Sequence, residues 1–239
     1  MSGGLGDIGQ ALARAFKKEG ADLALADLPG ASVEMEDYYS GLDVADAEAV
    51  EVWFDGVVRH FGRPPNIIIP NAAISTIKRY SEVSPAEWKR EIDVNLNGAF
   101  YFAHAGATRL LRESRPGRIV FLGSWAGHAP HVNLPAYSVA KAGLRMMMKT
   151  LALELAPRGI LVNEVAPGYV DAGLSGRIFA EKPDVREAAR SRVPNRQLIS
   201  ADDVARQALY LCSEDARHIT GTTLLQDGGL SLLQGPFAE

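Results

Sequence analysis

Three side chains in the middle of the chain have the types and the spacing of a proton-transfer site. Tyr137 and Lys141 stand at positions i and i+4 of a segment that predicts a helix, so both side chains project from one helix face. Ser124 lies in a glycine-flanked turn, directly after an apolar segment that predicts a strand. A phenol, an ammonium group and a hydroxyl held together can move a proton to or from a substrate oxygen.

The phenol needs an electrostatic partner before it can act as a base near neutral pH. The pKa of a free tyrosine is about 10, and one pKa unit corresponds to roughly 1.4 kcal/mol. An ammonium group about 4 Å away contributes roughly 4 kcal/mol at an effective dielectric constant of about 20. We therefore expect Lys141 to lower the pKa of Tyr137 to about 7. Taken singly, Ser124 also fits a turn cap, Tyr137 a core residue and Lys141 a solvated helix residue.

Helical and extended segments alternate along the chain that carries these residues. We expect helices over 9–18, 46–61, 84–112, 135–155 and 202–212, and strands over 21–26, 38–42, 66–70, 118–122, 160–165 and 223–226. This alternation predicts an α/β fold, a Rossmann-like doubly wound parallel sheet with helices on both faces. With no repeat or linker, residues 1–239 are expected to form one domain. Within it, the irregular or weakly helical segment 173–198 would cover the substrate.

A glycine-rich loop precedes the first expected helix. Gly4, Gly6 and Gly9 fit the spacing G-x-G-x-x-G, and residues 2–9 also fit a looser T-G-x-x-x-G-x-G spacing in which Asp7 replaces the middle glycine. Glycine lets the backbone approach a pyrophosphate, and a helix N-terminus favours the anion. Asp7 is expected to point away from that anion and to bond to local backbone. A flexible glycine-rich terminus is the alternative interpretation of the loop.

Asp27 ends the next expected strand, about where an acidic residue meets the adenosine ribose in dinucleotide-binding folds. Its carboxylate would accept hydrogen bonds from the ribose hydroxyls and repel a 2′-phosphate. Residues 28–30 offer no base to compensate that repulsion. The sequence therefore favours NAD over NADP.

The strand that should precede the glycine loop is apparently missing from the N-terminus. Only Met1 and Ser2 stand before the glycines, whereas in a doubly wound sheet this strand lies at the centre. Without it, the neighbouring strands would carry unpaired backbone groups, which are costly when buried. Either the chain begins upstream of Met1 or another segment fills the gap.

The ordered set of motifs resembles the short-chain dehydrogenase/reductase family over nearly the whole chain. Besides the glycine loop, the matching motifs are Asn71-Ala72-Ala73, Val94-Asn95-Leu96-Asn97-Gly98, the Ser124 turn, Tyr137-x-x-x-Lys141, Asn163 through Pro167-Gly168, Ile219-Thr220-Gly221 and Asp227-Gly228-Gly229. Tyr-x-x-x-Lys alone arises often by chance, so the order and spacing of the set carry the resemblance.

The resemblance implies a role for each matched residue. Tyr137 would transfer the proton, Lys141 would hold the nicotinamide ribose, Ser124 would align the substrate oxygen, and Asn95 would hold a water between Lys141 and bulk solvent. The implied cofactor-binding residues are Gly3, Leu5, Asp7, Ile8, Gly9, Asp27, Asp43, Val44, Asn71, Ala72, Ala73, Tyr137, Lys141, Pro167, Gly168 and Val170. The substrate would meet Ser124, Trp125, His128 and Tyr137, and the chemistry needs no metal.

Two features bear on how tightly substrate and cofactor bind. Ala172 stands where relatives commonly have a threonine that bonds the nicotinamide carboxamide, so we expect weaker cofactor binding. The covering segment is rich in basic residues, which suit an anionic or polyhydroxylated substrate or simply a solvated helix. These residues are Arg177, Lys182, Arg186, Arg190, Arg192 and Arg196.

Composition narrows the class of protein. A chain of 239 residues with 47% hydrophobic content can bury a sizeable core. The net charge of −4 argues against nucleic-acid and anionic-membrane partners. Cys212 is the single cysteine, so no intrachain disulfide can form. With no apolar stretch of about 18 residues and no signal-peptide pattern, we expect a cytoplasmic protein.

We therefore expect an oxidoreductase that transfers a hydride between NAD(H) and a secondary alcohol or ketone, with a sugar, polyol or hydroxy acid as substrate. The resemblance also implies a homo-oligomer, a tetramer or a dimer, built from the helix bearing Tyr137 and the one starting at Pro85. A 3-oxoacyl-type ketoreductase using NADP is one alternative, against which Asp27 argues. A catalytically silent NAD-binding or scaffold protein is another, against which the intact Ser124, Tyr137 and Lys141 argue.

Overall fold

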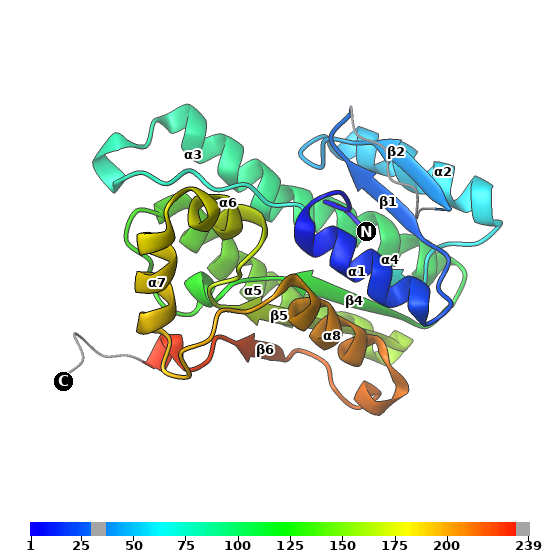
Figure 1. Cartoon of the computed structure of the whole chain (residues 1–239). Coiled ribbons are helices and arrows are strands. Elements are labelled where there is room, and N and C mark those ends of the chain that lie inside the picture. The colour runs from blue at the N-terminus through cyan, green and yellow to red at the C-terminus, as the bar shows by residue number, and fades with distance from the viewer. Residues whose placement is uncertain (30–36, 233–239) are drawn as a thin grey trace.

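The computed structural model describes residues 1–29 and 37–232, and its parallel strands are covered by helices on both sides (Figure 1). The strands are β1 (Ala24–Asp27), β2 (Tyr38–Gly41), β3 (Ile67–Ile68), β4 (Gly117–Leu122), β5 (Ile160–Pro167) and β6 (Thr223–Gln226). The helices are α1 (Asp7–Lys18), α2 (Ala47–Phe61), α3 (Pro85–Ile92), α4 (Gly98–Arg112), α5 (Pro135–Leu155), α6 (Gly173–Glu181), α7 (Pro183–Arg192) and α8 (Ala201–Cys212). The predicted Rossmann-like α/β fold is confirmed.

Two apolar cores lie on opposite faces of the sheet, because successive side chains of a strand point to opposite sides. In β4, Ile119 and Phe121 pack into the core that α2, α4 and α5 cover. Val120 and Leu122 pack into the core that α1 and α8 cover. Both faces of the strand are therefore buried over residues 119–122, which form a continuous apolar run.

Met1 and Ser2 join two parts of the sheet. β1 pairs with β2, and β3 to β6 pair in the order β3-β4-β5-β6, every pair parallel. Ser2 forms a parallel bridge to Ala26 on one side and to Pro70 on the other. Of the described residues, these two fill the central position at the end nearest the glycine loop.

A cavity of about 790 Å³ lies next to Met1, and residues of β1 and β3 contribute to its lining. Apolar residues line much of it, including Leu23, Ile68 and Phe54. The amino group of Met1 donates a hydrogen bond of 2.5 Å to the Ala24 carbonyl. Burial lowers the pKa of this amino group to about 5, so the neutral amine is favoured there.

The segment 84–112 differs from its prediction as one helix. Ser84 and Glu87 form a capping box ahead of α3. A π-helical turn over Asp93–Asn97 then separates α3 from α4. This turn places the side-chain amide of the buried Asn95 against Ile74. The amide donates a 2.8 Å hydrogen bond to the Ile74 carbonyl and accepts a 2.9 Å hydrogen bond from the Ile74 N–H. Wide turns of this kind concentrate at functional sites.

The covering segment is more regular than its sequence predicts. Where the sequence predicts irregular or weakly helical structure, residues 173–192 form the two helices α6 and α7, and Pro183 starts α7 where a missing N–H costs nothing. Arg186 is paired with Asp171, and Arg190 with Glu187, both at the surface. Among the described residues, no helix is long and apolar enough to cross a membrane.

The Ser2 hydroxyl gives a test of the bridge between the two parts of the sheet. It accepts hydrogen bonds from the N–H groups of Asn71 and Ala72 at 3.1 and 3.2 Å, and the residue is 1% exposed. Ser2→Ala should lower the free energy of unfolding by about 1–3 kcal/mol, since two buried donors lose their acceptor. The midpoint of thermal unfolding should fall by about 2–4 °C per kcal/mol.

The matched control is Ser191→Ala, which removes an exposed hydroxyl that donates to the Ala188 carbonyl. That change should stay within about 0.5 kcal/mol of the parent protein. Equal melting of both variants would show that the bridge does not hold the sheet together.

Candidate active site

Ser124, Tyr137 and Lys141 meet where β4 ends against α5. The Tyr137 phenol is hydrogen-bonded to the Ser124 side chain. The Lys141 ammonium lies 5.5 Å from the centre of the Tyr137 ring and donates a 2.8 Å hydrogen bond to the Leu122 carbonyl. Ser124 and Lys141 are almost wholly buried, at 7% and 2% exposed. The structure therefore brings together all three residues that the sequence selects.

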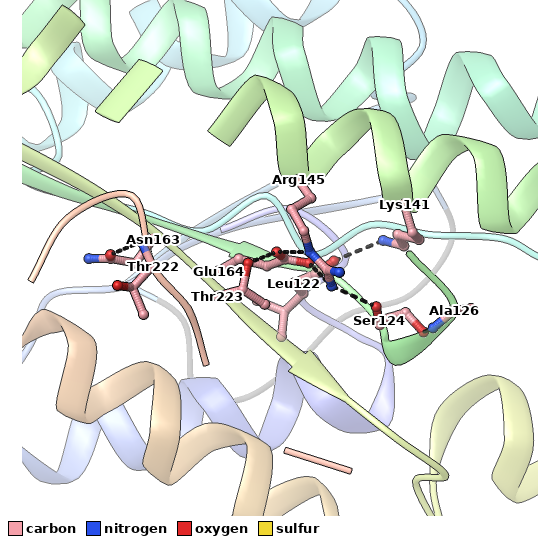
Figure 2. A network of polar contacts seen from close by, with 9 residues as sticks. All are labelled: Leu122, Ser124, Ala126, Lys141, Arg145, Asn163, Glu164, Thr222 and Thr223. Carbon is pink, nitrogen blue, oxygen red and sulfur yellow. Dashed lines mark hydrogen bonds and ion pairs between the residues drawn. The ribbon is translucent and has the colours of Figure 1, made fainter. Parts of the chain in front are cut away.

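The turn after β4 packs closely against α5, which explains the glycine at position 127. Ser124 precedes a short 3₁₀ helix, Trp125–Gly127, and its hydroxyl accepts a hydrogen bond from the Ala126 N–H. A Cβ on Gly127 would lie 2.7 Å from the Lys141 backbone. Figure 2 shows the Ser124 turn lying under the helix that carries Lys141. Close approach of turn and helix is what keeps the hydroxyl beside the phenol.

The pKa of Tyr137 corrects the expectation of about 7. Burial raises the pKa of Tyr137 to about 12, and the hydrogen bond with Ser124 offsets only part of this rise. The Lys141 ammonium points to the Leu122 carbonyl instead of the phenol oxygen, so the assumed contact is not made. Burial also lowers the pKa of Lys141 to about 8, and the negative charge of Glu164 opposes that shift.

The glycine loop fits a pyrophosphate. Gly3 has a φ of +62°, and a Cβ there would lie 2.8 Å from the Ala72 backbone. A Cβ on Gly9 would lie 2.1 Å from the Gly3 carbonyl oxygen. Gly6 caps α1 with no side-chain hydrogen bond, so the first N–H groups of this helix are left for an anion.

Two carboxylates flank the loop in different ways. Asp27 accepts hydrogen bonds of 2.8 Å from the N–H groups of Leu5 and Leu28, which fixes it beside the loop at the end of β1. Asp7 accepts a 2.7 Å hydrogen bond from the N–H of Gly173, at the start of α6. The expectation that Asp7 bonds to local backbone is therefore wrong, because its partner is 166 residues away. This contact ties the loop to the covering segment.

The motif that follows β3 braces the glycine loop. The Asn71 side chain donates a 2.7 Å hydrogen bond to the Gly3 carbonyl, and the Asn71 and Ala72 N–H groups bond to Ser2. Ala73, the third residue of the motif, is half-buried. A cofactor over the loop would thus rest on a backbone that Asn71 holds in place.

Other residues selected for the cofactor line the same edge of the sheet. Asp43 pairs with Arg90 at 2.9 Å, and Val44 is buried against Gly98. Gly168, after Pro167, donates to the Gln226 carbonyl, and Val170 forms a parallel bridge to Ile199. Ile8 packs partly buried against the core beside α1.

An aromatic cluster lies around Trp125, which the sequence predicts to meet the substrate. Trp125 packs edge-on against His131 and Tyr169, with ring centres 5.3 and 5.5 Å apart. His128, which the sequence selects, lies exposed beyond the 3₁₀ helix, and the structure brings His131 to the Trp125 ring instead. Sequence reasoning missed Tyr169, although an aromatic residue directly after Pro167-Gly168 at the end of a strand was a usable signal.

Two charged features near the site were also missed. Glu164 is a fully buried carboxylate within β5, and it is paired with Arg145 of α5. Glu91 of α3 is 1% exposed, and burial raises its pKa. A glutamate within the largely apolar segment 160–167 was the signal for the pair, since a buried charge requires a partner.

Comparisons with known proteins agree with this geometry. Residues 5–231 match the family described as Enoyl-(Acyl carrier protein) reductase. The chain is 34% identical over 251 residues to 3beta-hydroxysteroid dehydrogenase 1 of Eggerthella lenta, covering 98% of this chain and 94% of that protein. It is 29% identical over 244 residues to glucose 1-dehydrogenase 2 of Bacillus subtilis, covering 97% and 93%.

A solved structure of a short chain dehydrogenase from Bacillus anthracis matches with a TM-score of 0.87 at 28% identity, covering 98% of this chain and 96% of that one. Fold, site and relatives together define an oxidoreductase with a nicotinamide cofactor. The chain belongs to the short-chain dehydrogenase/reductase family.

The buried ammonium group of Lys141 predicts how stability depends on pH. Its pKa is lowered from 10.5 to about 8, so between these values the unfolded chain binds more protons than the folded one. Stability is therefore penalised at pH 7, and the penalty is relieved as the pH rises through 8 toward 10.5. Lys141→Met should raise the free energy of unfolding at pH 7 by an amount on the order of 3 kcal/mol.

Denaturant unfolding from pH 7 to pH 10 measures this difference, which should shrink as the pH rises. Lys149→Met, at an exposed position of the same helix, is the matched control. A Lys141→Met difference that is equal at every pH would contradict the burial of a charged Lys141.

Proposed function

We propose that the chain is an NAD(H)-dependent oxidoreductase that interconverts a secondary alcohol and a ketone. The observation that carries the proposal is the cluster of Ser124, Tyr137 and Lys141 at the end of β4, in which Ser124 and Lys141 are buried. Its residues are three of those to which the family resemblance assigns catalytic roles. The bound cofactor supplies the hydride chemistry, and the protein positions and polarises the substrate.

Each residue of the cluster has a distinct task in this proposal. The Ser124 hydroxyl holds the substrate oxygen, and the Tyr137 phenol donates a proton to that oxygen in reduction or accepts it in oxidation. At neutral pH the phenol is protonated, since its pKa is raised to about 12, which suits it as an acid. A positive charge close to the phenol oxygen lowers this pKa, so the Lys141 ammonium must turn from Leu122 for Tyr137 to act as a base.

Asn95 has a supporting task. Its side-chain amide is hydrogen-bonded to both the N–H and the carbonyl of Ile74, so it fixes the π-helical turn beside the site. We propose that this turn holds the water through which Lys141 exchanges protons with solvent.

Asp27 supports NAD over NADP. Two backbone N–H groups hold its carboxylate beside the loop, where it can accept hydrogen bonds from ribose hydroxyls. A 2′-phosphate at the same place would face this negative charge. The remaining cofactor contacts are assigned to the glycine loop, Asn71 to Ala73, Asp43, Val44 and the Pro167 to Val170 segment.

We propose a sugar, polyol or hydroxy acid as substrate, covered by residues 173–198 of a single domain over 1–239. The rings of Trp125, His131 and Tyr169 offer flat apolar faces together with polar edges, and glucose 1-dehydrogenase 2 is among the relatives. A relative at 30% identity, the 3-oxoacyl-[acyl-carrier-protein] reductase MabA of Mycobacterium tuberculosis, favours a second candidate, a ketoreductase acting on carrier-bound 3-oxoacyl chains.

We also propose a cytoplasmic homo-oligomer that packs through α5. Val139, Met146 and Leu153 are spaced by seven residues on this helix and are 51%, 64% and 82% exposed, so they form one apolar stripe. Leu144 and Met148 point the other way, into the core. A second copy that covers the stripe would bury it.

One experiment tests the proposed reaction. Sugars, polyols, hydroxy acids, hydroxysteroids and a 3-oxoacyl thioester are each offered with NAD(H) and with NADP(H), and the absorbance of the reduced cofactor is followed. Turnover of a secondary alcohol with NAD supports the proposal. Turnover restricted to the acyl thioester with NADPH favours the ketoreductase, and no turnover at all leaves a binding protein.

Tyr137→Phe should abolish turnover by removing the proton that is transferred. A loss of at least about 10²-fold in kcat is expected, the usual contribution of a general acid or base. Binding of NADH, measured by fluorescence, should persist because the loop and Asp27 are unchanged. The control is Tyr210→Phe, at a 40% exposed position on α8. Retained turnover in Tyr137→Phe would rule out the assigned mechanism.

Asp27→Ser should relax the choice of cofactor. Without the carboxylate, the ratio of kcat/KM for NAD to that for NADP should fall by about tenfold or more, since removing one unit charge near a phosphate changes binding by roughly 1.4 kcal/mol or more. Asp22→Ser, at a surface ion pair with Arg63, is the matched control. An unchanged ratio would mean that Asp27 does not meet the ribose.

A further inference from the structure

A buried ion pair lies directly beneath the Ser124 turn. Glu164 stands in the middle of β5 and is 0% exposed. Arg145 reaches it from α5, one helical turn beyond Lys141, with hydrogen bonds from Nε to Oε2 of 2.8 Å and from Nη2 to Oε1 of 3.2 Å. Such a two-point contact fixes the guanidinium plane as well as its position.

Both members of the pair also hold other parts of the site (Figure 2). The Arg145 Nη2 donates a 3.1 Å hydrogen bond to the backbone carbonyl of Ser124. The Glu164 carboxylate accepts a 2.6 Å hydrogen bond from the Thr223 hydroxyl of β6. Arg145, Glu164, Ser124 and Thr223 are therefore joined in one connected network of hydrogen bonds.

Gly123 shows how closely the turn rests on the pair. A Cβ at this position would lie 1.8 Å from the Glu164 carboxylate oxygen. The Gly123 N–H donates a 2.8 Å hydrogen bond to the Val165 carbonyl, which extends the β4–β5 ladder past the carboxylate. The backbone leading into Ser124 is thus supported by Glu164 and tethered by Arg145.

We propose that Arg145 and Glu164 are positioning residues for the catalytic turn: their pair sets where the Ser124 hydroxyl lies and balances the charge beside Lys141. This inference rests on the proposed function, since it assigns these residues to the same site. Neither residue touches the reacting atoms, so they act through Ser124 and Lys141.

The charges around Lys141 predict an effect of the Arg145–Glu164 pair on the pKa of Lys141. On α5, Lys141 is flanked by Tyr137 and Arg145. From β5 it faces Glu164, whose negative charge favours the ammonium form. From α3, Glu91 acts on Tyr137. Removing Glu164 alone leaves an unbalanced positive charge near Lys141, whereas removing Arg145 alone leaves an unbalanced negative charge.

Two single variants are therefore expected to shift the same titration in opposite directions. Glu164→Gln should lower the pKa of Lys141, and Arg145→Met should raise it, each by about one unit. The alkaline limb of the kcat/KM profile should move with it, to lower pH in Glu164→Gln and to higher pH in Arg145→Met. Both variants should lose about 10-fold to 100-fold in kcat, with little change in NADH affinity, because the Ser124 turn is displaced.

The double variant Arg145→Met/Glu164→Gln keeps the test valid if a single variant does not fold. It leaves no unpaired charge, and replacing a whole buried pair is often tolerated. Its pH profile should match that of the parent enzyme, but its kcat should stay low because the Ser124 carbonyl has lost its donor. Arg145→Lys, which keeps the charge without the two-point contact, should restore the pH profile more fully than kcat.

The matched control is Arg109→Met on α4, which removes another buried arginine, paired with the exposed Glu51 and Asp55 away from the site. It should lower the melting temperature without changing kcat or the pH profile. If the Arg145 and Glu164 variants behave in the same way, or if both shift the profile in one direction, the pair is structural and the proposal fails.

A measurement without turnover separates this proposal from the proposed function. Lysine labelled with ¹³C at Cε reports the titration of Lys141 by NMR, with the resonance assigned through Lys141→Met. Opposite shifts in the two single variants support the charge balance even if no substrate is found. Unshifted titrations in an enzyme that does turn over would overturn it while leaving the reaction intact.

Discussion

The parallel pairing of β4 with β5 is the constraint on which the site depends. Its register sets Phe121 against Glu164 and Leu122 against Val165, so the turn that carries Ser124 begins where β5 supplies a carboxylate. Helix α5 then packs over both strands and brings Tyr137 and Lys141 to the same place. A shift of this register by one residue would turn Glu164 to the opposite face of the sheet and separate it from Arg145.

Much of this arrangement could be predicted from the sequence, because its signals are local. Helical spacing places Tyr137 and Lys141 on one face, and glycines mark the turn around Ser124 and the loop before α1. The capping residues Asp46 and Ser84 also act as their types predict. Each of these inferences needs only residues that are neighbours along the chain.

The features that escaped prediction depend on contacts between distant segments. The helical pattern of 84–112 does not reveal the π-helical turn, which is fixed by the Asn95 amide meeting Ile74 across the fold. Nor does the sequence show that Asp7 meets Gly173. The expected pKa of Tyr137 failed for the same reason, since it assumed a direct contact with Lys141 and neglected the burial of both groups.

Burial of charge is what links the site to the rest of the sheet. A buried ion pair contributes little to stability compared with apolar residues of the same size, because desolvation cancels most of the attraction. Stability alone therefore does not explain why the Arg145–Glu164 pair lies next to the Ser124 turn, whereas the other contacts of the two residues do. The guanidinium satisfies a carbonyl in the turn, while the carboxylate supports the Lys141 ammonium that burial disfavours. An uncharged side chain in place of Glu164 would stabilise the ammonium form of Lys141 less.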